Sequence, residues 1–260
     1  RTETSTNASS NGTIQTTTKP TWAAARDLDI AGETLGNGDI LTLSIANNQG
    51  GQLESQLTTS SKGNLNKVGR FFLAFNSTNI TNKIKEGTLN VELFGASFSG
   101  DVSNMRLIAV KSDEPGGGTL VKSDFDNIVG LSAGASMQGN VTIYSDIVNV
   151  TSTGAQTLNF KLTQDALEDI VSLNVFNVAI VEYDHDFLNV TPTDLGARNV
   201  RTENNTTWSS IDLIFSPTRK QIRNFKRTIK SKGSQGRGFT AKDIVITTGG
   251  KTVANGFDNG

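Results

Sequence analysis

The chain has one histidine, His185, which lies between Asp184 and Asp186 in a segment that favours a β-strand. A histidine beside carboxylates could serve as a general base, but a catalytic triad also needs a serine or cysteine nucleophile placed against it in space. The chain has no cysteine, which also excludes disulfides and thiolate metal sites. Alternation along a strand would put His185 on the same face as Tyr183 and Phe187. We therefore interpret it as a packed histidine and assign no catalytic residue.

Four aspartates are candidate ligands for a hard cation such as Ca²⁺, which takes six to eight oxygen ligands. They are Asp124 and Asp126 in an expected loop, and Asp184 and Asp186 on one face of the expected strand. Neither pair follows the spaced Asp-x-Asp-x-Asp-Gly pattern of a calcium loop. The alternatives are a solvated acidic strand end, a partner for Arg70, or a partner for the basic segment of a neighbouring molecule. We expect no cofactor other than this candidate Ca²⁺.

The strongest local signal is a basic segment near the C-terminus. Residues 219–260 hold ten basic and two acidic residues, a net charge of +8, whereas residues 1–218 carry −9. Ser216 and Pro217 are a suitable N-cap and first turn for a helix that ends near Gly233. We interpret this helix as an assembly arm, with a polyanion-binding segment and a solvated tail as alternatives. Its contact residues would be Arg219, Lys220, Ile222, Arg223, Phe225, Lys226, Arg227, Ile229 and Lys230.

Two further motifs have less specific interpretations. Trp208 lies in a polar loop and could contact a glycan by stacking on a sugar face, with a core or loop anchor as the alternative. The run Gly249-Gly250-Lys251-Thr252 imitates the end of a phosphate-binding loop but lacks the preceding glycine that the motif requires. We read it as the turn of a β-hairpin within residues 243–254.

Eight segments read as strands from their alternation or their β-branched residues, which predicts an all-β, antiparallel jelly-roll sandwich. In the segment 70–75, for example, Phe71, Leu73 and Phe75 share one face. The expected strands are 40–46, 70–75, 88–94, 104–110, 140–150, 156–162, 174–188 and 209–215. No apolar run reaches the ~18 residues of a transmembrane span.

A short helix and two arms complete the expected organisation. Thr163 can cap a helix that turns Ala166, Leu167 and Ile170 to one side. We expect an N-terminal polar arm over residues 1–20, a sandwich over 21–217, and a basic C-terminal arm over 218–260 that contains a helix and a hairpin. The polar arm is so rich in Thr, Ser, Asn and Gly that it should be disordered unless something holds it.

The segments 69–76 (GRFFLAFN) and 85–93 (KEGTLNVEL) resemble the jelly-roll modules of the DNRLRE type and related carbohydrate-binding-module-like domains. In that family an Arg-led strand ends in Phe-Asp, whereas this chain has Asn76 in place of the Asp. Residues 157–166 and 180–192 are similar to the second half of such modules in tailed-phage structural proteins. The resemblance implies a non-enzymatic jelly-roll module of virion or extracellular structures.

Together these observations lead to one functional hypothesis and two alternatives. We expect a structural protein of a virus particle, of the tailed-phage kind, that serves as a capsid decoration, neck or tail component. Its arms would contact copies of itself and other virion proteins, giving a homo-oligomer located in the virion. The alternatives are a subunit of an extracellular filament or adhesin at the cell surface, and a module that binds a surface glycan.

Overall fold

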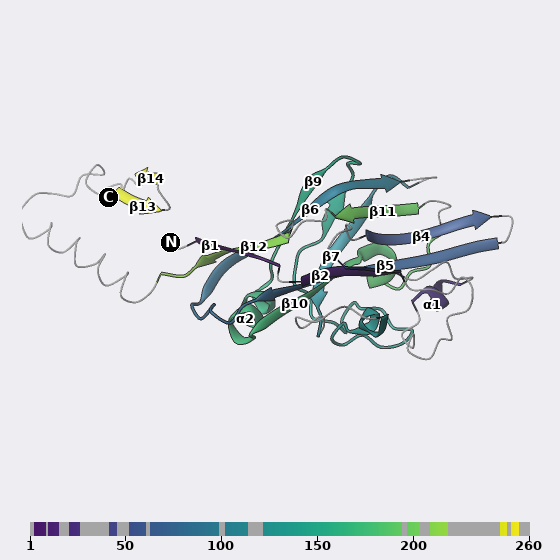
Figure 1. Ribbon diagram of the computed structural model, residues 1–260, viewed down its shortest axis with the longest axis horizontal. Coiled ribbons are helices and arrows are strands. Elements are labelled where there is room, and N and C mark those ends of the chain that lie inside the picture. The colour runs from purple at the N-terminus through teal and green to yellow at the C-terminus, as the bar shows by residue number, and fades with distance from the viewer. Residues whose placement is uncertain are drawn as a thin grey trace, which may run out of the picture.

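The structure is a computed structural model, and its strands form an all-β sandwich of two antiparallel sheets (Figure 1). It describes residues 3–8, 10–15, 21–26, 42–45, 52–60, 63–98, 102–113, 122–193, 197–202, 209–217, 245–248 and 251–254. The first sheet holds β1 (Glu3–Asn7), β12 (Ser209–Phe215), β6 (Ile84–Phe98), β9 (Gln156–Lys161), β11 (Ala197–Thr202) and β4 (Gln52–Ser60). The second holds β3 (Thr42–Ile45), β2 (Ser10–Gln15), β5 (Gly63–Asn76), β10 (Val175–Glu182), β7 (Met105–Lys111) and β8 (Val148–Val150).

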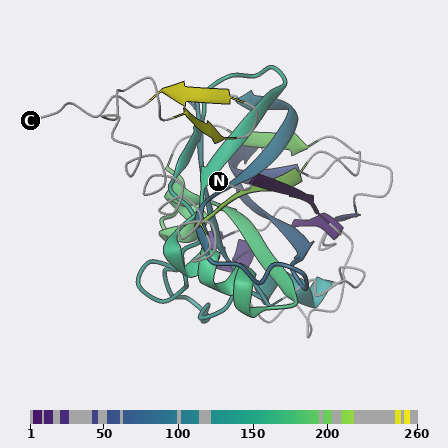
Figure 2. The same cartoon turned by 90° about the vertical axis from the view of Figure 1, so that its left-hand side faces the viewer.

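The long strand β5 connects the two sheets. Its first part, up to Val68, pairs with β4 of the first sheet, and from Gly69 onward it pairs with β2 of the second. From Phe71 onward it also pairs with β10. The two layers are seen end-on in Figure 2, from the end where β1 and β12 lie.

The main core lies between the two sheets. Phe71, Leu73 and Phe75 of β5 are buried there, which confirms the face that alternation predicted. Leu89 and Val91 of β6 face them from the first sheet. Aromatic packing adds to this core, because the Tyr144 ring stacks on Phe176 with ring centroids 4.9 Å apart.

A second core covers the outer face of the second sheet. Phe72 of β5 and Val181 of β10 point to this side and pack with Trp22, Phe125 and other residues of the covering segments. These segments are α1 (Trp22–Ala25), the short helix η2 (Lys122–Asp126), the loop that follows η2, and the turn η3 (Tyr183–Phe187). A sheet buried on both faces explains why residues 71–75 form an unbroken buried run.

The predicted short helix is confirmed as α2 (Gln164–Ser172). The Thr163 hydroxyl accepts a hydrogen bond from the backbone N–H of Ala166, and Ala166, Leu167 and Ile170 are the buried residues of the helix. The helix lies against β6 at Gly87, where an added Cβ would come within 2.8 Å of Leu167. A glycine at this position therefore allows the close approach of helix and sheet.

Two expected strands are shorter than predicted. Of residues 140–150, Val148–Val150 form β8, and Ile143 and Ser145 form isolated bridges. The segment 174–188 is a strand up to Glu182 and then turns into η3, so the predicted alternation around His185 is wrong. The cause is the Glu182 side chain, whose carboxylate accepts hydrogen bonds from three consecutive backbone N–H groups and caps the turn.

The ends of the chain contain strands as well. The N-terminal polar arm supplies β1 to the first sheet and β2 to the second, so the sandwich itself holds this segment in place. Near the C-terminus, β13 (Val245–Thr248) and β14 (Lys251–Ala254) form the predicted hairpin as a separate two-stranded sheet (Figure 1). No helix in the described ranges is both long enough and apolar enough to cross a membrane.

Candidate functional site

A buried cluster of charged side chains joins the N-terminal helix to the second sheet. Its centre is Asp186, which is fully buried in the turn η3. Arg70 of β5 donates to both carboxylate oxygens of Asp186, from Nε at 2.8 Å and from Nη2 at 2.9 Å. Arg26, directly after α1, donates from Nε to Asp186 Oδ1 at 2.8 Å and from Nη2 to the Asp186 carbonyl, also at 2.8 Å. One carboxylate thus fixes two arginines from distant parts of the chain.

Arg70 makes further contacts with η2. Its Nη1 donates to the carbonyl of Phe125 at 2.7 Å, and its guanidinium carbon lies 3.9 Å from the centre of the Phe125 ring. Asp126 is nearby, with 3.6 Å between its Oδ1 and Arg70 Nη1. Burial alone would raise the pKa of Asp186, but Arg70 and Arg26 outweigh it and hold that pKa below its usual range. Asp186 is therefore ionised at neutral pH.

Glu182, at the end of β10, is the second buried carboxylate of this region. It is 0% exposed, and burial raises its pKa to about 7 even though backbone hydrogen bonds from His185 and Asp186 oppose the shift. Its Oε2 accepts from the His185 N–H at 2.6 Å. The pKa of Glu182 thus places its titration near neutrality, in contrast to that of Asp186.

His185 lies in the turn between these two carboxylates and packs against an aromatic ring, as the sequence interpretation expected. Its ring meets Trp22 edge-on, with 6.1 Å between the centroids, and its Nδ1 lies 2.9 Å from the carbonyl oxygen of Val190. These contacts hold the imidazole in the second core and fix the position of α1 beside it.

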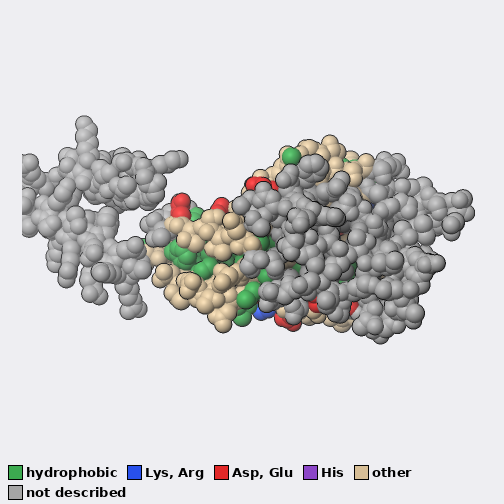
Figure 3. All heavy atoms as spheres, in the orientation of Figure 1, with side chains coloured by type: hydrophobic (Ala, Val, Ile, Leu, Met, Phe, Trp, Pro, Cys, Tyr) green, Lys and Arg blue, Asp and Glu red, His purple; other side chains and the backbone are tan. Residues whose placement is uncertain are grey.

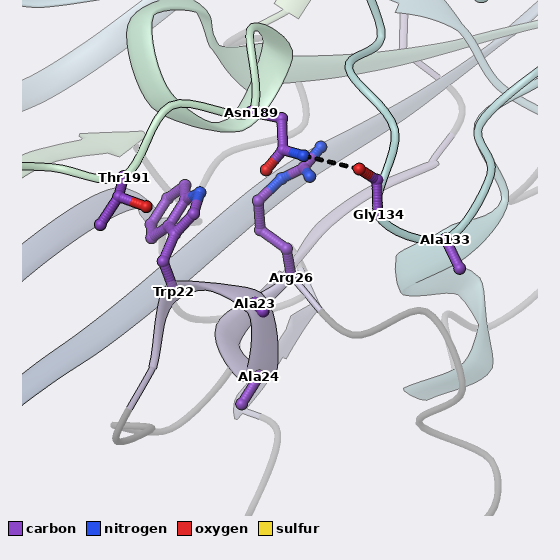
Figure 4. Close-up of a pocket in the computed structure, with 8 residues that line it drawn as sticks. All are labelled: Trp22, Ala23, Ala24, Arg26, Ala133, Gly134, Asn189 and Thr191. Atoms are coloured by element: carbon purple, nitrogen blue, oxygen red, sulfur yellow. Dashed lines mark hydrogen bonds between the residues drawn. The ribbon is translucent and has the colours of Figure 1, made fainter.

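A pocket of 610 Å³ opens beside this cluster (Figure 4). Trp22 and Arg26 rise into it from the region of α1, opposite Asn189 and Thr191. The Asn189 side-chain amide donates to the Gly134 carbonyl at 2.9 Å, and Asn189 has a φ of 54°, in the left-handed region.

The structure places the four aspartates of the predicted calcium site in different roles. Asp126 and Asp186 both approach Arg70, which confirms the alternative in which an acid is the partner of that arginine. Asp184 pairs with Arg106 of β7 at the surface, and Asp124 accepts from the side chain of Asn127 at 3.0 Å. Among the described residues, no group of three or more His, Cys, Asp or Glu side chains is placed to hold a metal ion.

Other predicted site residues lie outside the described residues. They are Trp208 and the arm residues Arg219, Lys220, Ile222, Arg223, Phe225, Lys226, Arg227, Ile229 and Lys230. Sequence reasoning did not single out Trp22 or Arg26. A usable signal was present, because Thr21 is a good N-cap for the short helix Trp22–Ala25 that carries Trp22 and is followed by Arg26.

Comparisons with known proteins give little guidance. No family model matches the chain, and no curated protein matches it. Among solved structures, a candidate glycoside hydrolase from Bacteroides thetaiotaomicron aligns at 10% identity, over 77% of this chain and 63% of that chain, with a TM-score of 0.26. This chain thus covers less than two thirds of the length of that protein, and a likeness at this score supports neither a shared fold nor a shared activity.

Proposed function

We propose that the protein is a structural subunit of a virus particle of the tailed-phage kind, a capsid decoration, neck or tail component that assembles through its two arms. The observation that carries the proposal is the placement of the N-terminal arm. Within fifteen residues it adds one strand to each sheet of the sandwich, with β1 at the margin of the first sheet and β2 in the second.

The first strand of the arm, β1, places no fully buried side chain in the core. Four of the five side chains of β1 are exposed and the fifth, Thr6, is half-buried. The strand is held by main-chain pairing with β12 in an unbroken register from Glu3 opposite Ile214 to Asn7 opposite Ser210. Side chains of β1 that face solvent are accessible for contacts with neighbouring subunits.

The charge distribution supports contacts through the C-terminal arm as well. Residues 219–260 carry +8, and the rest of the chain carries −9. Charges of opposite sign on arm and body favour head-to-tail association between copies and weaken as salt screens them, because the Debye length falls from about 10 Å at 0.1 M salt to about 3 Å at 1 M. The resemblance to jelly-roll modules of phage structural proteins points in the same direction.

Light scattering of the full chain over a salt series tests the proposal. We expect assemblies larger than a dimer at low salt that dissociate as salt rises. A variant with Arg223, Lys226 and Lys230 replaced by glutamine should lose these assemblies. The matched replacement of three lysines on the sandwich, Lys83, Lys85 and Lys161, should keep them. A full chain that stays monomeric at low salt and high concentration would contradict the proposal.

A further inference from the structure

We propose that the outward face of α2 binds the basic C-terminal arm of a second copy. The inference rests on the proposed function and deepens it, because it names the surface of the sandwich that receives the arm. This face carries Asp165, Glu168 and Asp169, which we call the acidic strip. Neutralising the strip should therefore prevent assembly, as neutralising the arm should.

The acidic strip occupies one side of α2, and that side is accessible. Glu168 and Asp169 follow Asp165 by three and four positions, so both are its neighbours on the helix surface. The buried residues of α2 lie on the other side, against β6 and the main core (Figure 1). Asp165 and Glu168 are exposed, and the side chain of Asp169 keeps 21% of its surface exposed. A partner can therefore reach the strip without any movement of the helix.

The described contacts balance only part of the negative charge of the strip. Lys111 of β7 places its Nζ 2.9 Å from Asp169 Oδ2, and the Tyr144 hydroxyl donates to the same oxygen. Glu168 accepts from the side-chain amide of Gln164 at 2.8 Å, which brings no charge. α2 itself contains no lysine or arginine. Three carboxylates beside this lysine leave an excess of negative charge on the face.

Most of the strip does not serve the stability of α2. The helix dipole favours Asp165 in the first turn but disfavours Asp169 in the last turn, where a cation would be favourable. Acids three or four positions apart also repel one another. Positive side chains brought by another molecule would relieve both effects. The arrangement therefore fits a binding surface for a basic partner.

The C-terminal arm has the complementary composition. Residues 219–230 contain six basic residues and no acidic one. The sequence predicts a helix here with Ile222, Phe225 and Ile229 on one side. On the sandwich, Leu173 ends α2 beside the strip and is 37% exposed. The arm can thus place basic groups on the carboxylates and an apolar side chain on Leu173, as an amphipathic helix does on its target.

A second set of exposed acids provides a comparison. Glu86 and Glu92 of β6 and Asp212 of β12 are exposed on the first sheet. Glu86 pairs with Lys85, with 2.6 Å between Lys85 Nζ and Glu86 Oε1, and Asp212 accepts from the side chain of Asn90 at 2.9 Å. These acids lie among polar and basic neighbours on a strand surface, so they form no acidic strip and serve as the control.

Light scattering of the full chain at low salt tests the inference with two matched variants. The first combines Asp165→Asn with Glu168→Gln, and the second combines Glu86→Gln with Glu92→Gln, so each loses two exposed charges. We expect the first variant to have the mass of a single copy at concentrations at which the wild type and the second variant are assembled. Both should melt close to the wild type, because all four side chains are exposed. A first variant that assembles like the wild type overturns the inference.

An exchange of charges between two chains tests the contact directly. One chain carries Asp165→Lys and Glu168→Lys, and the other has all six basic residues of 219–230 replaced by glutamate. Each chain alone should stay monomeric at low salt, because its arm and its α2 face carry charges of the same sign. Mixing the two should restore assemblies, since each arm then meets a face of opposite sign on the other chain. A mixture that stays monomeric overturns the inference.

These experiments separate the two proposals. A wild type that stays monomeric at low salt contradicts both of them. A wild type that assembles through its basic arm, together with an α2 variant that assembles equally well, overturns the α2 contact alone. The arm would then bind another surface of the neighbouring copy, and the proposed function would stand.

Discussion

Replacing Asp186 by asparagine should destabilise the protein more than any comparable change of one polar atom on its surface. The substitution keeps the size of the side chain but removes the charge that Arg70 and Arg26 share. All three side chains lie in the interior, with 0%, 0% and 4% of their surface exposed for Asp186, Arg70 and Arg26. Arg26 would then lose the carboxylate with which it pairs, and Arg70 would keep Asp126, whose Oδ1 lies 3.6 Å from its Nη1.

Breaking one buried ion pair by removing a partner costs about 3–5 kcal/mol. Because Asp186 pairs with two buried arginines at 2.8 Å, we expect a loss of at least about 4 kcal/mol from the free energy of unfolding. Domains of this size are stabilised by about 5–15 kcal/mol in total, so the loss is a large share. At about 2–4 °C per kcal/mol, the melting temperature should fall by at least ~8 °C.

Urea unfolding followed by circular dichroism measures this loss, with Asp184→Asn as the matched control. Asp184 lies two residues away and also pairs with an arginine, Arg106, but these side chains are 29% and 40% exposed. An exposed pair is worth at most about 1 kcal/mol. Equal losses of unfolding free energy in Asp186→Asn and Asp184→Asn would contradict this prediction, because the buried cluster would then add no more stability than an exposed ion pair.

Two further predictions concern stability. Burial raises the pKa of Glu182 from 4.5 to about 7. The protonated carboxyl group therefore stabilises the folded state fully below pH 4.5. This stabilisation, about 3 kcal/mol, is lost as the pH rises through 7. The difference in unfolding free energy between wild type and Glu182→Gln should therefore change over this pH window, and parallel pH profiles would contradict it. Gly130→Ala should destabilise strongly, because Gly130 has a φ of +89° and an added Cβ would lie 2.1 Å from the Asn140 carbonyl oxygen. Gly134→Ala, at a φ of +69° with open space around it, should cost about 1 kcal/mol in a chemical melt, and equal losses at the two sites would refute the steric argument.

Elements with a local signal were predictable from the sequence. Ser209–Phe215 is a strand with the predicted bounds, because its alternating Ile211, Leu213 and Phe215 mark one buried face. Thr163 marks the start of α2, since a capping hydroxyl acts within one turn of its own residue. The sequence Gly249-Gly250 predicted the hairpin of β13 and β14, because a pair of glycines favours a tight turn between antiparallel strands.

Features that depend on distant contacts were not predictable. Eight of the eleven residues of β1 and β2 are Ser, Thr, Asn or Gly, with little apolar alternation. Their strand conformation comes from main-chain pairing with β12 and β5. The bond between Arg26 and Asp186 joins residues 160 positions apart. The turn η3 has an alternating sequence, and the capping role of Glu182 becomes visible once the fold brings its side chain over the N–H groups of the turn.

The proposed assembly of this sandwich with other copies is tested most directly by the size of the full chain in solution. We would measure light scattering at low salt over a range of concentrations, in parallel with the variant whose basic arm is neutralised. The account predicts assemblies larger than a dimer for the full chain and a smaller species for the variant. A full chain that keeps the mass of a single copy at every concentration would contradict it.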